Sequence, residues 1–165
     1  MDWLTFGVQW LHVLLGILWF GYSLSLAVII IPAINRLAIT RQREIGQYLG
    51  ERGEAVIDFV GPAVIVLGFI RGTWLGQLHS VSDVFGSTYG VTWLVGLLAA
   101  TATFLWGKFV IVGALDAMNR LPLGADGTAT PELVAATDRV KLVVVLELAG
   151  FLTVFTCMIL MRFGL

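Results

Sequence analysis

A histidine that shares a helical face with small and aromatic residues is the chemically most distinctive pattern in this chain of 165 residues. His12, Gly16 and Trp19 fall on one face of a predicted helix, because residues three or four positions apart lie above one another. An imidazole beside the gap left by a glycine suits the axial ligation of a haem iron. Alternatively, His12 is a buried histidine that hydrogen-bonds to a neighbouring helix.

Arg71 is a second candidate, because it interrupts a stretch in which Gly68, Gly72 and Gly76 recur every four residues. That spacing predicts a face on which the backbone of a neighbouring helix approaches closely. A guanidinium group pairs with carboxylates such as the propionates of haem, whereas the alternative is that Arg71 extends to the membrane interface. The tryptophans that could pack against a porphyrin ring are Trp10, Trp19, Trp74 and Trp93.

Two charged residues lie inside predicted membrane helices. Lys108 and Glu147 fall at similar depths in the third and fourth apolar runs, so we expect them to form an ion pair. Such a pair serves either as a structural clamp between the helices or as part of a proton relay.

Several residues towards the predicted outer side of the membrane are potential metal ligands. His79 directly follows the second apolar run and is a possible second metal ligand, or else a solvated loop histidine. Cys157, Met158 and Met161 end the fourth run, and together with His12 they would suit Cu(I). Alternatively, the methionines only fill gaps in the packing.

Four long apolar runs must position these residues. They cover about 3–31, 56–78, 91–115 and 140–161, and each reaches the roughly 20 residues that a helix needs to cross a bilayer. With 58% hydrophobic and 13% charged residues, the chain is too apolar for a soluble domain. We therefore predict an all-α integral membrane four-helix bundle that forms a single domain over residues 1–165. The gaps at 32–55 and 116–139 suit short helices at the membrane edge.

The basic residues predict the orientation of this bundle. The second connection, residues 80–90, contains no Lys or Arg. By the positive-inside rule, this connection and both termini lie outside, and the two basic connections face the cytoplasm. The basic residues are Arg36, Arg41, Arg43 and Arg52 in the first connection and Arg120, Arg139 and Lys141 in or after the third.

Helix ends are predicted from proline and from capping residues. Pro32 should close the first helix, and Pro62 should lie one turn inside the second. Prolines and glycines predict an irregular loop over 121–131, and Thr137 or Asp138 is the expected N-cap of the last helix.

Composition also bounds the partners. The net charge of −1 and the lack of a basic patch with interleaved aromatics argue against nucleic-acid binding. The single cysteine excludes an internal disulfide. The expected partners are the lipid bilayer and either further copies of the chain or other membrane subunits.

The segment from Trp10 through His12, Gly16 and Trp19 to Gly21 resembles the first helix of the bacterial protoporphyrinogen IX oxidase and copper resistance protein D families. Two shorter segments, 87–90 and 119–120, resemble the copper resistance D pattern, and Glu147 is similar to a glutamate of the oxidase family. Trp93 matches the oxidase pattern, but the lysine that follows in that family is missing here.

The resemblance implies a bundle built around His12, with haem b or a porphyrin as the ligand. It also implies a multi-pass protein of the inner membrane of a bacterium. It also implies a role as an electron-transfer component of a membrane oxidoreductase. Three hypotheses follow: haem or porphyrin binding, copper handling, and a non-catalytic subunit of a larger membrane complex. The site expected for the first comprises His12, Gly16, Trp19, Arg71, Trp74 and Trp93.

Overall fold

The computed structural model describes residues 2–124 and 127–165, and every regular element in these ranges is helical. The elements are α1 (Trp3–Ser25), the π-helical segment η1 (Leu26–Ile30), α2 (Ile31–Ile34), α3 (Ile39–Gly72), α4 (Val81–Gly86), α5 (Thr88–Leu105), the π-helical segment η2 (Trp106–Ile111), α6 (Val112–Asn119) and α7 (Pro131–Arg162).

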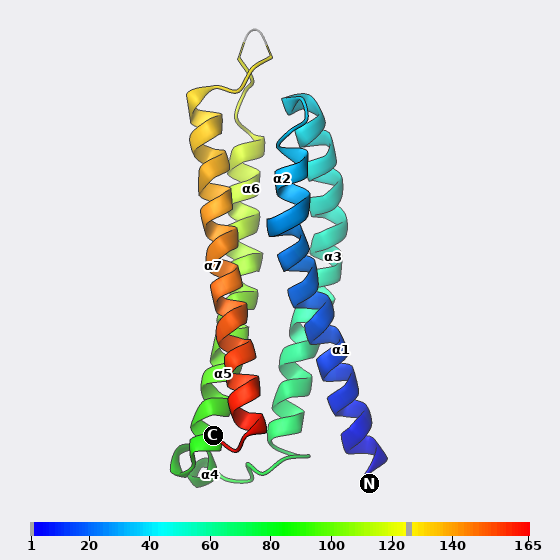
Figure 1. Cartoon of the computed structure of the whole chain (residues 1–165), viewed down its shortest axis with the longest axis vertical. Helices are drawn as coiled ribbons and strands as arrows, with labels where there is room; N and C mark the ends of the chain where they lie inside the picture. Colours follow the sequence, from blue (N-terminus) through cyan, green and yellow to red (C-terminus); the bar gives the residue numbers. More distant parts are fainter. Residues whose placement is uncertain (1, 125–126) are drawn as a thin grey trace.

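Four long helical rods dominate the structure (Figure 1). Trp3–Ile34, Thr88–Asn119 and Pro131–Arg162 each contain 32 residues, and Ile39–Gly72 contains 34. At 1.5 Å per residue each rod is about 50 Å long, which exceeds the roughly 30 Å of a hydrocarbon core. All four are apolar enough to cross a membrane, and this confirms the prediction of an all-helical chain with four candidate membrane helices.

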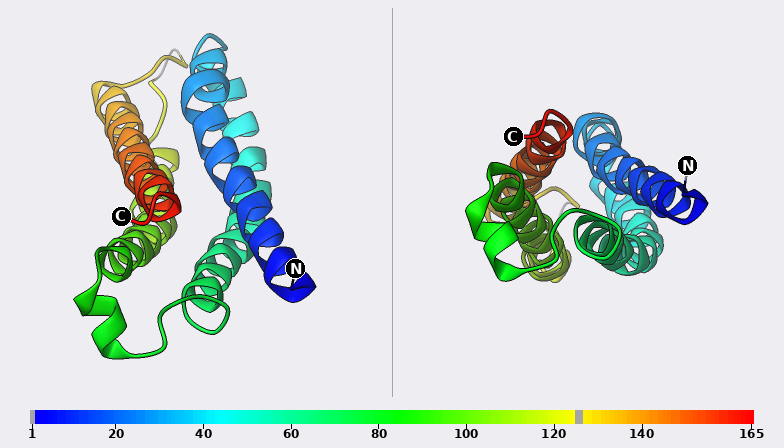
Figure 2. Two further views of the ribbon diagram at one scale, coloured as in Figure 1. Left: turned by 60° about the horizontal axis from the view of Figure 1, so that its bottom comes forward. Right: turned by 90° about the horizontal axis from the view of Figure 1, so that it is seen from below.

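The rods are arranged as two pairs. Seen from below, α1 lies beside α3 and α5 lies beside α7 (Figure 2). Both termini lie at the same end of the bundle as α4, whereas the connections after α2 and α6 lie at the other end (Figure 1). Placement of the termini with the second connection agrees with the predicted topology, while their assignment to the outside stays a prediction.

The predicted boundaries of the second rod are wrong at both ends. Instead of short helices over 32–55, α3 begins at Ile39 and continues unbroken into the membrane-spanning part. Its first turns hold an exposed Arg41–Glu44 ion pair three residues apart. The helix ends at Gly72, six residues before the predicted end, and the chain then turns so that the N–H of Leu78 donates to the Gly72 carbonyl.

The last rod begins earlier than predicted. Thr130 is its N-cap, because the Thr130 side chain accepts a hydrogen bond from the N–H of Leu133 at 3.3 Å, and Pro131 occupies the first helical position. The proposed cap Thr137 lies inside the helix and donates to the Leu133 carbonyl at 2.8 Å. The predicted loop therefore extends only to Thr130, and its residues 125–126 lie outside the described residues.

Pro32 and Pro62 both lie within helical structure. Pro32 does not end the first rod, which continues to Ile34 after the π-helical segment η1. Pro62 lies inside α3, but about six turns after its start at Ile39 and not one turn as predicted, because the helix begins earlier than its apolar run. A proline inside a helix is tolerated in a membrane bundle.

Two apolar clusters form the interior. The first contains Trp19, Val60, Val64 and Phe151, and the Trp19 ring meets the Phe151 ring edge to face at 4.9 Å. The second contains Ala114, Val140, Val143 and Val144. Large apolar side chains also cover the outside of the rods, as a lipid environment requires.

Candidate functional site

The His12 side chain points from α1 towards α3. Its Nδ1 lies 3.0 Å from the backbone carbonyl of Val64. Because a carbonyl oxygen only accepts hydrogen bonds, Nδ1 carries the proton and donates it. In the neutral ring the lone pair is therefore on Nε2, which has no hydrogen-bond partner among the described residues.

Glycine makes room for this ring on α3. A Cβ built on Gly68 would lie 3.0 Å from Cε1 of His12, so any larger residue would push the imidazole away. Gly16, one turn further along α1, has nothing within 4 Å of a built Cβ, so space is open on that side. Nδ1 thus makes the hydrogen bond to a neighbouring helix that the alternative interpretation expected, whereas Nε2 stays available to bind a metal.

Trp93 reaches the same point on α3 from α5. Its indole N–H donates to the Gly68 carbonyl at 3.3 Å, and the ring covers Gly72, where a Cβ would overlap Nε1. His12 and Trp93 therefore meet α3 within one turn of each other. The glycine face receives aromatic side chains here, not the backbone of a neighbouring helix.

Arg71 lies in the last turn of α3, closer to the membrane edge than its predicted position two turns inside. One guanidinium NH2 group donates to the Leu75 carbonyl at 3.0 Å, and Nε is buried without a partner in the described part of the chain. The other guanidinium NH2 group has no protein partner there. The guanidinium therefore keeps donors for an anionic group.

Three other predicted site residues lie elsewhere. Trp19 belongs to the first apolar cluster and is only 3% exposed, so it packs the core and does not face a ligand. Trp74 lies in the turn after α3 and is 77% exposed. His79 is exposed at the start of the α4 connection, and its backbone N–H donates to the Asp83 carboxylate at 2.9 Å.

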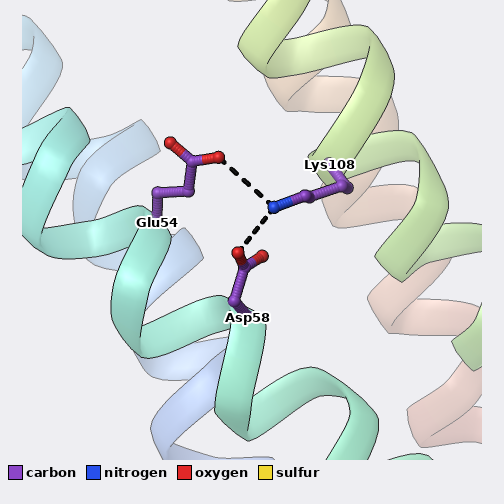
Figure 3. Close-up of polar contacts among 3 residues, drawn as sticks. All are labelled: Glu54, Asp58 and Lys108. Carbon is purple, nitrogen blue, oxygen red and sulfur yellow. Dashed lines mark hydrogen bonds and ion pairs between the residues drawn. The ribbon is translucent and has the colours of Figure 1, made fainter.

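The predicted ion pair between Lys108 and Glu147 is wrong. The Lys108 ammonium lies 3.3 Å from Glu54 and 2.5 Å from Asp58, both on α3 (Figure 3). The two carboxylates are one helical turn apart, so a single long side chain from η2 reaches both. Glu147 is instead buried, at 9% exposure, and faces the interior.

The ligands considered for copper do not gather. Cys157 is buried against α5, where a Cβ on Gly96 would lie 3.1 Å from its Cβ, whereas His12 packs on α3. Within residues 2–124 and 127–165, no three His, Cys, Asp or Glu side chains form a group that could hold a metal ion.

Glycines along α3 accept rings from both neighbouring helices, including two positions that were not predicted from the sequence. Gly53 receives Tyr22 of α1 and Gly61 receives Phe104 of α5, in addition to the contacts at Gly68 and Gly72. The spacing of these glycines along one helix was the available signal. Comparison of the chain with protein-family models, with curated proteins and with solved structures gave no match.

Proposed function

We propose that this chain is an integral membrane protein that binds haem b or a related porphyrin through Nε2 of His12. The observation that carries the proposal is the hydrogen bond from Nδ1 to the Val64 carbonyl. Histidines that ligate metals commonly donate their other ring nitrogen to a carbonyl, which fixes the tautomer and the ring orientation. Here that bond leaves Nε2 as the ring nitrogen with a free lone pair.

The neighbouring residues fit a flat, dianionic ligand in part. Gly16 leaves open space one turn after His12 on α1, and Arg71 offers a free guanidinium NH2 group one turn after Gly68 on α3. A hollow of about 320 Å³ on the outward side of α1 is lined by Phe6, Gln9, Trp10, Val13, Leu14 and Ile17. His12 is not among the residues that line this hollow, so a ligand held by His12 would lie on the face of α1 that is turned towards α3.

Each residue would contribute a separate function. When bound, the haem would supply one-electron redox chemistry. His12 would ligate and orient it, Arg71 would neutralise a propionate, and the apolar side chains of α1 would exclude water. Since His79 is exposed in a connection, His12 is the one of the two histidines that would hold the haem at this site.

The absorption spectrum of the purified full chain tests this proposal. We expect a Soret band after haem reconstitution that His12→Ala abolishes and Lys108→Ala retains. Gly16→Leu is the sharper variant, because it fills the open space without touching the hydrogen bond from His12 to Val64. Loss of the band in Gly16→Leu with unchanged unfolding would support the site. A wild-type protein that stays colourless in excess haem would refute it.

A second candidate is a non-catalytic subunit in which His12 and Trp93 have a structural role. Both side chains hydrogen-bond to backbone carbonyls of α3, so their role would be to fix the packing of three helices. In that case gentle solubilisation would yield a larger complex. His12→Ala would then lower the unfolding midpoint without changing any spectrum.

A further inference from the structure

Glu147 is a buried carboxyl that the proposed haem site does not use. It lies on α7 and is 9% exposed. Val143 and Val144 of the second apolar cluster lie one turn before it, and Phe151 of the first cluster lies one turn after it. The carboxyl is therefore enclosed between the two apolar clusters of a membrane bundle.

No cation neutralises this carboxyl in the described ranges. The Ser23 hydroxyl of α1 interacts with it as a hydrogen-bond donor. The nearest lysine along η2, Lys108, extends to Glu54 and Asp58 on α3. Tyr22, beside Ser23, directs its hydroxyl to the Leu49 carbonyl of α3 at 3.5 Å.

The backbone of η2 makes space for the carboxyl. Oε1 of Glu147 lies against Gly107, where a built Cβ would come within 2.8 Å. In the same segment, the indole N–H of Trp106 donates to the Val143 carbonyl at 3.0 Å and fixes η2 against α7. A larger residue at position 107 would displace the carboxyl, so Gly107 provides the space that the end of the Glu147 side chain occupies.

Irregular helix geometry occurs on two of the helices that face Glu147. Gly107 lies inside the π-helical segment η2, and η1 begins three residues after Ser23. π-Helical turns are rare in proteins and occur frequently at functional sites. One π-helical segment follows α1 and the other follows α5, and both lie near the level of the Glu147 carboxyl. The two irregular turns are therefore linked to Glu147.

We propose that Glu147, with Ser23 and Gly107, forms a proton-binding site inside the membrane-spanning part of the bundle. An ionised carboxylate in an apolar interior without a paired cation is strongly destabilised, whereas the neutral acid needs only a hydrogen-bond partner. Release of the proton would create an uncompensated charge between the apolar clusters. Proton uptake and release at Glu147 would thereby be coupled to the packing of α1, η2 and α7.

Infrared spectroscopy of the purified full chain tests this site. We expect a C=O stretch of a protonated carboxylic acid at neutral pH that shifts in D2O and disappears in Glu147→Gln. Glu132→Gln is the matched control, because Glu132 is exposed in the first turn of the same helix. Ser23→Ala should shift the frequency of the band by removing its hydrogen bond. Identical wild-type and Glu147→Gln spectra would overturn the proposal.

A second measurement needs no variant. Dicyclohexylcarbodiimide adds to protonated carboxyls in apolar surroundings, and peptide mass spectrometry of the wild-type protein should place the adduct on Glu147. Excess Na⁺ at constant ionic strength should not protect the residue. Protection would show that Na⁺ and not a proton occupies the site, and a lack of labelling at Glu147 would also overturn the proposal. His12→Ala should leave labelling unchanged, so this result is separable from haem binding.

Discussion

Substitution of Gly72 tests the packing of α3 against its neighbours. A Cβ at this position overlaps Nε1 of Trp93, so Gly72→Ala must displace the indole. The displacement breaks the hydrogen bond to the Gly68 carbonyl, and such interhelical bonds contribute about 0.6 kcal/mol on average in membranes. Overpacking adds about 1–3 kcal/mol, and the higher helix propensity of alanine offsets about 1 kcal/mol.

The expected net effect is a destabilisation of about 0.5–2.5 kcal/mol. Equilibrium unfolding in mixed micelles, followed by circular dichroism, measures it. Gly21→Ala is the control on a helix of similar character, because nothing lies within 4 Å of a Cβ built there, and it should be neutral or stabilising.

A double-mutant cycle identifies the cause. In a Trp93→Ala background the overlap is gone, so Gly72→Ala should become as harmless as Gly21→Ala. The reasoning would be refuted if Gly72→Ala were already harmless in the wild-type background. It would equally be refuted if the cost of Gly72→Ala persisted without the indole.

Three further predictions concern charges and caps. Lys108→Gln leaves two facing carboxylates on α3 without their cation, so its unfolding midpoint should fall more than that of Lys141→Gln, which breaks an exposed pair within one helix. Hydrogen bonds from a serine hydroxyl and two backbone N–H groups lower the pKa of Asp83 below 3.8, so α4 should be stabilised above that pH and lose this support as the pH falls through the lowered pKa. Nuclear magnetic resonance of α4 amides checks this, with Asp83→Asn expected to remove the pH dependence. Thr130→Ala removes the N-cap of α7 and should cost about 1 kcal/mol in unfolding free energy, whereas an unchanged midpoint would contradict the cap.

Helix number was predictable because it depends on long apolar runs. The orientation derived from the distribution of charge stays a prediction. Helix ends were less predictable. The predicted start at residue 56 marks the place where α3 becomes apolar, but helix formation continues through the polar residues back to Ile39. Thr130 was missed as a cap because the last helix was assumed to begin with its apolar run.

The candidate site was predictable only as a set of unusual residues. His12, Trp93 and Gly68 were identifiable by type and spacing, yet their convergence depends on how three helices rotate about their axes. Lys108 illustrates this limit. Glu147 was expected as its partner because the two residues lie at similar depths in their helices. In the structure, Lys108 lies on the side of η2 that faces α3, so its ammonium group reaches two carboxylates one turn apart on α3.

The length of α3 has a consequence for surface electrostatics. Its 34 residues give about 51 Å of helix, and its first half lies beside the first rod, because the Tyr22 ring meets Gly53 and the Tyr22 hydroxyl donates to the Leu49 carbonyl. Arg52 therefore lies at the level of Tyr22, within the first apolar run. That run ends at Ile31, about 14 Å beyond Tyr22, and Arg43 and Arg41 lie about 15 and about 18 Å beyond Gly53 in the same direction. The Debye length in physiological salt is about 8 Å, so both arginines are close enough to the end of the apolar run to feel an anionic surface. Recruitment to acidic lipids would thus depend on the charges at the start of α3.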